Sequence, residues 1–120
     1  MTGPRVVLVE DEPLVAMMME DLLADLGCEV AASFGSLAPA MAWLDRQDPL
    51  PDGAVLDVNL GGGETVFPLA EALRARGVPF VFATGYGVLP SDGYPDTPLI
   101  RKPVDQDQLL PVVRAFAAIA

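Results

Sequence analysis

Short apolar runs alternate with longer amphipathic stretches along almost the whole sequence. The runs are rich in Val, Leu, Phe and Ile and are bounded by Gly, Pro and acidic residues, as the buried strands of a parallel sheet are. The stretches between them carry apolar residues at helical spacing, so the alternation predicts βαβ units and an α/β fold. The predicted strands are residues 6–10, 28–33, 53–60, 79–84 and 98–102.

Helices are predicted between and after these strands. The first begins at Pro13, where a proline costs no hydrogen bond, and ends before Gly27. The second has Ser36 as its N-cap residue, the third covers about 65–76, and the last begins at about residue 105. The residues expected to face the core are Val15, Met18, Met19, Leu22 and Leu26, then Ala40 and Leu44, then Val66, Ala70 and Leu73, and finally Leu109, Val112, Val113 and Phe116.

Some positions have mainly structural interpretations. The run Met17-Met18-Met19 is predicted to pack within the first helix and not to form a binding face. Cys28, the single cysteine, has no partner for an internal disulfide and is expected to be a small core residue. Pro111 fits the last helix poorly, because a proline inside a helix removes a backbone hydrogen bond.

Composition excludes several classes of function. The chain has 120 residues, 52% of them hydrophobic, so one domain over residues 1–120 is expected. A net charge of −10 argues against nucleic-acid binding, which needs clustered Lys and Arg. The absence of histidine excludes His-based acid–base catalysis and His-containing zinc sites. No apolar run is long enough to span a membrane and no signal-peptide pattern is present, so a cytoplasmic location is expected.

Polar side chains end most of the predicted strands. Glu10 and Asp11 end the first strand, Asp57 ends the third, Thr84 the fourth and Lys102 the fifth. In a three-layer α/β sandwich the active site lies beyond the carboxyl ends of the strands, so we expect these side chains to meet. Clustered carboxylates repel each other and are stable mainly when a hard cation such as Mg²⁺ neutralises them. With an ammonium and a hydroxyl nearby, such a site suits a phosphoryl group transferred to Asp57.

Each of these residues also has a purely structural interpretation. Asp11 or Glu12 can cap the first helix, and the acidic pair taken alone favours that interpretation. Asp57 can be an ordinary loop carboxylate and Lys102 a solvated surface lysine. Thr84 can satisfy its own turn. The agreement of four strand ends on one chemistry is what favours a site.

The stretches VVLVEDEP, VLDVNL, FATG and IRKP, in this order and spacing, resemble the receiver domain of two-component response regulators. The resemblance covers essentially the whole chain. It implies a doubly wound, five-stranded parallel sheet of the flavodoxin-like class with strand order 2-1-3-4-5. It also implies a Mg²⁺ cofactor and transfer of a phosphoryl group from a phosphohistidine on a sensor histidine kinase.

The residues that carry the chemistry of the family have matching positions in this chain. The matching residues are Glu10 and Asp11 for the metal-binding acidic pair, Asp57 for the phosphorylated aspartate, which is also a metal ligand, Asn59 for the metal-binding main-chain carbonyl, Thr84 for the switch hydroxyl, Lys102 for the lysine and Lys102-Pro103 for the step that is able to be cis.

Two features depart from the usual receiver pattern. Leu99 stands three residues before the lysine, where an aromatic switch residue is usual. Residues 88–96 have no helical periodicity, so the helix after the fourth strand is expected to be short, irregular or absent. FATGYG resembles the FATGUY-motif subgroup of single-domain receivers, whose partners are often kinases of the HWE or a related class. We hypothesise that Tyr86, with Tyr94 as the second candidate, replaces the missing aromatic and forms a partner face with strand five.

The leading interpretation is a stand-alone receiver that signals through contacts with an unknown downstream protein. It would be a signalling phosphoacceptor that catalyses its own phosphorylation and dephosphorylation, not an enzyme, and a monomer or weak dimer. A phosphate sink or a relay uses the same residues and stays open. The alternative is a Mg²⁺-dependent phosphohydrolase with an aspartyl-phosphate intermediate, but such enzymes of the haloacid dehalogenase type carry D-x-D after the first strand, which this chain lacks.

Overall fold

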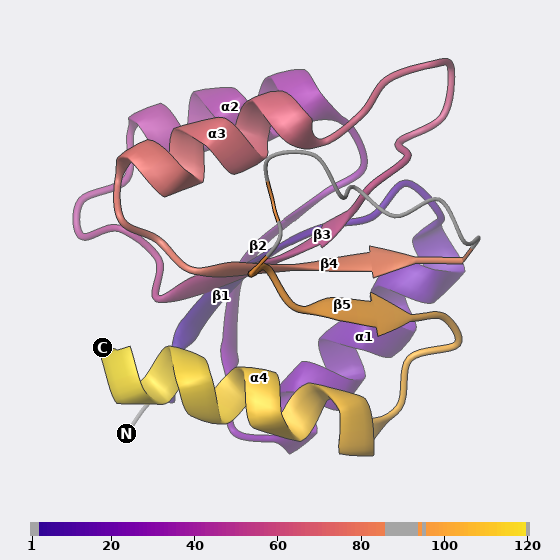
Figure 1. Ribbon diagram of the computed structural model, residues 1–120, viewed down its shortest axis with the longest axis vertical. Coiled ribbons are helices and arrows are strands. Elements are labelled where there is room, and N and C mark those ends of the chain that lie inside the picture. The colour runs from indigo at the N-terminus through magenta and orange to yellow at the C-terminus, as the bar shows by residue number, and fades with distance from the viewer. Residues whose placement is uncertain (1–2, 86–93, 95, 120) are drawn as a thin grey trace.

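The computed structural model describes residues 3–85, 94 and 96–119. In this part of the chain five strands form one parallel sheet in the order β2-β1-β3-β4-β5 (Figure 1). The predicted flavodoxin-like α/β fold and its strand order are therefore confirmed. The strands are β1 (Arg5–Val9), β2 (Glu29–Phe34), β3 (Gly53–Asp57), β4 (Phe80–Thr84) and β5 (Leu99–Arg101).

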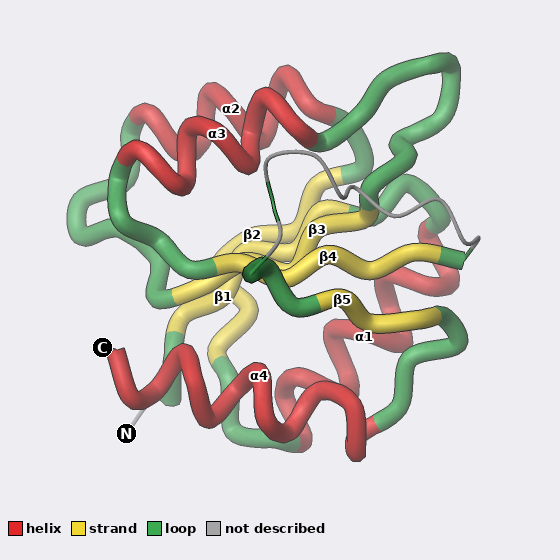
Figure 2. The backbone as a smooth tube through the Cα atoms, viewed as in Figure 1, coloured by secondary structure: helices red, strands yellow, loops and turns green. Residues whose placement is uncertain are grey.

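Helices cover both faces of the sheet and make it the middle of three layers (Figure 2). α2 and α3 pack on one face, and α1 and α4 pack on the other. Neighbouring residues of β4 alternate between the two cores, with Val81 facing α1 and α4 and Phe82 facing α2 and α3. The helices of the described residues are α1 (Pro13–Asp25), α2 (Leu37–Asp45), α3 (Phe67–Ala75) and α4 (Gln106–Ile119).

Two sequence predictions concern the connections around β5. The prediction of a short, irregular or absent helix after β4 falls on residues 86–93 and 95, which lie outside the described residues. The Lys102–Pro103 peptide bond is cis, as the resemblance implied.

α4 begins before Pro111, so this proline does lie inside the helix. Within the described part of the chain, none of the helices combines the length and the apolar character that a membrane crossing requires.

The inward face of α1 differs from the prediction. Its buried residues are Ala16, Met19 and Leu23, whereas Met17 and Met18 are 60% and 56% exposed. The prediction that the methionine run packs inside the protein is therefore wrong for these two residues. Ala16 is small and adds little to an apolar stripe, so the sequence pattern was centred on larger neighbours and the predicted face was rotated about the helix axis.

Tyr94 anchors the chain to α3 just before β5. Its ring is 9% exposed, with its centroid 5.1 Å from that of Phe82 and 5.6 Å from that of Phe67. Its hydroxyl donates a hydrogen bond to Glu71, and the Arg74 guanidinium lies 4.3 Å from the ring centroid. Burial and the Glu71 carboxylate raise the pKa of Tyr94 to about 12, so the hydroxyl stays a proton donor at neutral pH. These contacts give Tyr94 a structural role in holding the end of the β4–β5 connection.

Candidate functional site

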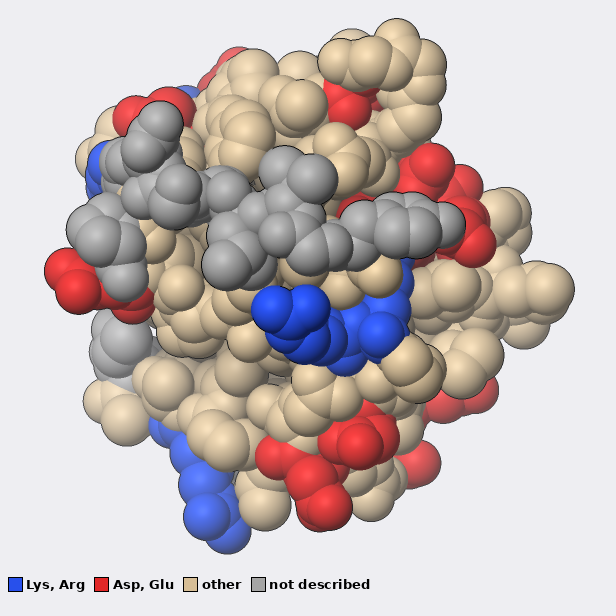
Figure 3. Space-filling model, turned by 45° about the vertical axis from the view of Figure 1, so that its right-hand side comes forward, with Lys and Arg blue, Asp and Glu red and all other residues tan. Residues whose placement is uncertain are grey.

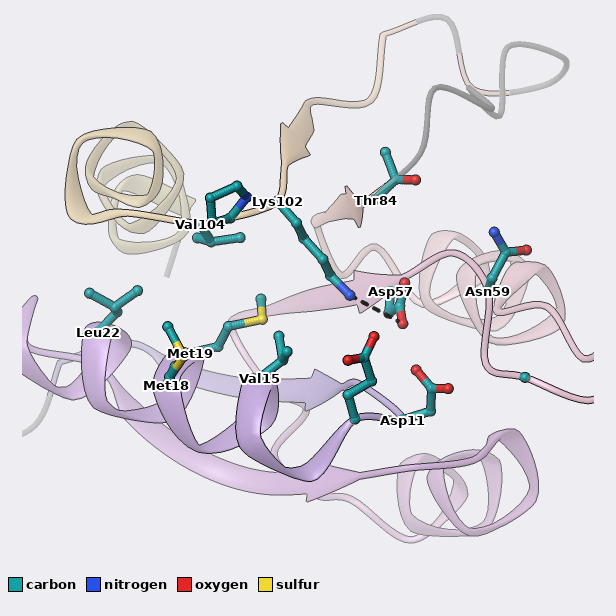
Figure 4. A pocket seen from close by; sticks show the side chains of 14 residues that line it. Asp11, Val15, Met18, Met19, Leu22, Asp57, Asn59, Thr84, Lys102 and Val104 are labelled. Atoms are coloured by element: carbon teal, nitrogen blue, oxygen red, sulfur yellow. Dashed lines mark ion pairs between the residues drawn. The ribbon is translucent and has the colours of Figure 1, made fainter.

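The carboxyl ends of β1, β3, β4 and β5 meet at one cleft of about 620 Å³ (Figure 4). The register of the sheet explains this meeting, because Asp57 lies beside Ala83 on β4 and Thr84 lies beside Arg101 on β5. Lys102 follows directly, and its main-chain N–H donates to the Thr84 carbonyl oxygen at 2.9 Å. Of the predicted site residues, Asp11, Asp57, Asn59, Thr84 and Lys102 line this cleft.

One ammonium group connects the two most buried carboxylates of the site. Lys102 Nζ lies 2.5 Å from Glu10 Oε1 and 3.4 Å from Asp57 Oδ2. The side chains of Glu10 and Asp57 are 0% and 8% exposed, so both charges have lost most of their hydration. A single positive charge between two buried carboxylates leaves one negative charge uncompensated. Figure 3 shows one group of basic side chains on the surface at this end of the molecule, with acidic side chains above it to the right and others below it.

The surroundings of Asp57 shift its proton affinity. Burial, then a hydrogen bond with Asp11 and the negative charge of Glu10, raise the pKa of Asp57 to about 7, although Lys102 acts in the opposite direction. Burial lowers the pKa of Lys102, but its ion pairs with Glu10 and Asp57 outweigh burial and leave that pKa above its usual value. A carboxyl group shifted this far in a cleft is a candidate functional group.

The acidic cluster at the start of α1 fits a hard cation. Carboxylate oxygens of Glu10, Asp11 and Glu12 lie within 4.8 Å of one another, and Asp57 faces the same cleft. These donors are all oxygens, which Mg²⁺ prefers, and the chain has no histidine to attract softer metals. Glu10 is already engaged, because its Oε1 pairs with Lys102 and its Oε2 accepts the Glu12 N–H at 3.0 Å. Asp11 is also a predicted ligand and lines the cleft, but it does not share the contacts that engage Glu10.

Asn59 offers a main-chain oxygen at the same cleft. It pairs with Thr65 across a hairpin formed by residues 58–66. The hydrogen bonds that flank this pair join Val66 N to the Val58 oxygen at 3.1 Å and Leu60 N to the Glu64 oxygen at 2.9 Å. Among the described residues, no backbone hydrogen bond uses the Asn59 carbonyl. The role of this oxygen as a metal ligand, which the resemblance implies, stays a prediction.

The structure describes Thr84, Leu99 and Tyr94, but not Tyr86, which was predicted to act as the switch. Thr84 is 3% exposed, and it lines the cleft as the last residue of β4. Leu99 pairs with Phe82 in the sheet and packs partly buried against the core on the α3 side. Tyr86 lies outside the described residues, so its role as a switch stays a prediction. Tyr94 contacts Phe80, at the start of β4 and the opposite end of that strand from Thr84.

Two acidic residues of the site region were not assigned from the sequence. Glu12 occupies the N-cap position of α1 but makes no cap hydrogen bond, and its carboxylate joins the acidic cluster instead. Capping is therefore the wrong interpretation for the Glu12 side chain. Glu64 contacts α2 from the hairpin after Asp57, with its Oε1 2.9 Å from the Leu37 nitrogen. Only the run of three carboxylates at 10–12 could have pointed to Glu12, and no local pattern pointed to Glu64.

An apolar surface adjoins the polar part of the cleft. One wall consists of side chains from α1 and the start of the α4 connection, namely Val15, Met18, Met19, Leu22 and Val104 (Figure 4). Next to this wall, and sharing Met18 with it, Leu14, Met17 and Met18 are 75%, 60% and 56% exposed, and we call these three residues the α1 patch. An exposed apolar group beside a site is typical of a surface that contacts another protein.

Similar proteins were found among curated sequences and among solved structures. No protein-family model matches the sequence. The sensor protein GacS of Pseudomonas syringae pv. syringae is 29% identical over 131 residues, which cover 98% of this chain and 14% of GacS. The chain therefore spans a small part of that relative.

Solved structures match over nearly their full length. SdrG from Sphingomonas melonis Fr1 is 40% identical with a TM-score of 0.82, covering 95% of this chain and 96% of SdrG. The BeF3-activated conformation of SdrG from Pseudomonas melonis Fr1 is 41% identical with a TM-score of 0.78, covering 98% and 99%. The receiver (REC) domain of the response regulator PhyR from Erythrobacter litoralis is 25% identical with a TM-score of 0.81, covering 96% and 90%.

Replacing Asp57 by Asn should stabilise the metal-free protein. Because the pKa of Asp57 is raised in the folded state, its ionised form opposes folding, and this cost is absent below about pH 4 and complete above about pH 7. We expect Asp57→Asn to raise the free energy of unfolding by about 1–3 kcal/mol at pH 8 and by little at pH 4. Urea unfolding at both pH values measures the difference. A gain that is equal at the two pH values would contradict the electrostatic explanation.

Proposed function

This chain belongs to the response regulator receiver family, and on that basis we propose that it accepts a phosphoryl group on Asp57 from a sensor histidine kinase in a Mg²⁺-dependent reaction. The proposal rests on the functional groups that one cleft brings together. Asp57 lies there with an acidic cluster, the Lys102 ammonium and the Thr84 side chain. Each of these groups has a part in phosphoryl transfer.

The transfer needs a nucleophile and positive charge. One Asp57 oxygen forms the new P–O bond while the P–N bond to the donor imidazole breaks, and the imidazole nitrogen then takes up a proton from solvent. Bound Mg²⁺ would supply positive charge to the phosphoryl oxygens, and Asp11, Asp57 and the Asn59 carbonyl are the proposed ligands. Lys102, already 3.4 Å from Asp57, supplies further positive charge, and the Thr84 hydroxyl donates a hydrogen bond to a phosphoryl oxygen.

A protein phosphodonor also needs a surface to dock on. The α1 patch continues into the apolar wall of the cleft through Met18, so a protein seated on it would lie beside the cleft that holds Asp57. We assign this patch to the donor kinase, and we propose that this kinase is of the HWE or a related class. The BeF3-activated conformation of SdrG supports the phosphoacceptor role, since trifluoroberyllate imitates a phosphoryl group.

The signal is proposed to leave through the β4–β5 side of the molecule. Thr84 ends β4, and Leu99 lies beside Phe82 without the aromatic ring usual in the family. We propose that Tyr86 takes over from that ring and that Tyr94, held to Glu71 on α3, serves as a fixed anchor. A phosphate sink or relay uses the same acceptor chemistry. A phosphohydrolase would differ by continuous turnover.

Small phosphodonors test the acceptor residue. With Mg²⁺ and acetyl phosphate, we expect the wild-type protein to gain the mass of one phosphoryl group in an acid-stable, base-labile form, and Asp57→Asn to gain none. Intact-protein mass spectrometry with phosphate release followed in parallel gives both readouts. Steady release of phosphate from generic phosphoesters would instead favour the phosphohydrolase. A mass gain that persists in Asp57→Asn would show that another residue is the acceptor.

Changes to the α1 patch should separate the two kinds of donor. The double variant Leu14→Gln, Met17→Gln should slow phosphorylation by a histidine kinase about tenfold, because loss of apolar contacts at an interface costs on the order of 1–2 kcal/mol. Phosphorylation by acetyl phosphate should be unchanged. Ala24→Gln, an exposed position of α1 outside the patch, is the matched control. Equal slowing with both donors would mean that the patch does not dock the kinase.

Tyr86 is tested through the response of β5. When BeF3 and Mg²⁺ are added, we expect the NMR amide signals of Leu99 and Ile100 to shift in the wild-type protein and to shift much less in Tyr86→Leu. Tyr94→Phe, which removes only the hydroxyl bonded to Glu71, should respond as the wild type does. A full response in Tyr86→Leu would refute the assignment.

A further inference from the structure

The hairpin that follows Asp57 has an intrinsically flexible tip. The three glycines at 61–63 have φ angles of +81°, +60° and +80°, a region that other residues rarely adopt. Leu60 N donates to the Glu64 oxygen at 2.9 Å and Glu64 N donates to the Gly61 oxygen at 3.0 Å, which closes the tip. Because glycine loses more conformational freedom on ordering than any other residue, contacts outside the hairpin help to offset the entropy cost of ordering such a tip.

Glu64 makes such a contact with α2. Its Oε1 accepts the N–H of Leu37, the first residue of α2, at 2.9 Å. Ser36 occupies the N-cap position predicted for it, and its side chain makes no cap hydrogen bond. The hydrogen bond to the start of α2 comes instead from Glu64, 27 positions after Leu37 in the chain. Figure 1 shows the β3–α3 connection projecting at the same edge of the sheet as the start of α2.

The other side of the hairpin faces the acidic cluster. A Cβ atom placed on Gly61 would lie 3.3 Å from Asp11 Oδ2, so the hairpin backbone closely approaches this carboxylate. The hairpin also carries Asn59, whose main-chain carbonyl no described backbone hydrogen bond uses. The connection from β2 into α2 also contacts the acidic cluster, because the main-chain N–H of Glu10 donates to the Phe34 carbonyl oxygen at 2.9 Å. The hairpin is therefore held between α2 and the site.

We propose that Glu64 is a positioning residue for the metal site. By holding the hairpin of residues 58–66 against α2, it fixes the Asn59 carbonyl and the Asp11 carboxylate around one point. The inference rests on the proposed function, because it requires that Mg²⁺ binds at this point. By thermodynamic linkage, the factor by which the Glu64–Leu37 contact strengthens Mg²⁺ binding is also the factor by which Mg²⁺ strengthens that contact.

The test compares variants that keep or remove the acceptor oxygen. Glu64→Ala should weaken Mg²⁺ binding about tenfold in isothermal titration calorimetry, the low end of what loss of an outer-shell partner costs. Glu64→Gln keeps an acceptor for the Leu37 N–H and should stay within about twofold of the wild type, since salt screens the lost charge. Arg76→Ala, which breaks the 2.7 Å ion pair with Asp45 at the other end of α2, is the matched control. It should lower thermal stability without changing Mg²⁺ affinity.

A second readout separates positioning from plain structural support. Mg²⁺ should slow hydrogen exchange of the Leu37 amide in the wild type by the same factor that Glu64→Ala costs in affinity, and should not slow it in Glu64→Ala. Equal Mg²⁺ affinity in Glu64→Ala and the wild type would overturn the inference alone. So would a loss in Glu64→Gln as large as in Glu64→Ala, because charge and not position would then be responsible. A wild-type protein that binds no Mg²⁺ would overturn the proposed function, and this inference with it.

Discussion

A single ammonium group ties three parts of this structure together. Lys102 Nζ lies between the Glu10 and Asp57 carboxylates and thereby ties the chain after β5 to the ends of β1 and β3. Glu10 continues the connection, because its second oxygen accepts the Glu12 N–H at the start of α1. Truncation of Lys102 would leave two buried carboxylates without a counter-charge, which costs several kcal/mol in comparable pairs. The ammonium is thus a structural element as well as part of the site.

The same arrangement links cation binding to folding. One positive charge for two buried carboxylates leaves the folded state with excess negative charge, and burial, a hydrogen bond with Asp11 and the charge of Glu10 together raise the pKa of Asp57. A ligand that binds only the folded state stabilises it, so a cation at the acidic cluster would increase stability as well as prepare the acceptor. The hairpin of residues 58–66 belongs to this linkage, since it joins the acidic cluster to α2 through Glu64.

The sequence predicted those parts of the site that follow from strand geometry. In-register parallel strands bring their ends together, so Asp57, Thr84 and Lys102 could be placed in one cleft from the apolar runs before them. The face of α1 could not be placed as well, because Ala16 contributes little to an apolar pattern although it packs directly on the sheet. The Glu64–Leu37 contact joins the hairpin to the first residue of α2, which only the folded sheet brings together, and no local signal encodes it.

The exposed thioethers beside the cleft have a chemical consequence of their own. Met17 and Met18 lie on the surface of α1, where oxidants can reach their sulfur atoms, whereas Met19 is 2% exposed and shielded. Conversion to the sulfoxide makes such a side chain polar without changing the carboxylates around Asp57. Under the proposed function, mild oxidation would weaken docking on the α1 patch before it affected the reacting groups, and methionine sulfoxide reductases would reverse the change. If the α1 patch docks a phosphodonor as proposed, methionine oxidation is the redox reaction that would reach this contact first, since the chain's cysteine is buried.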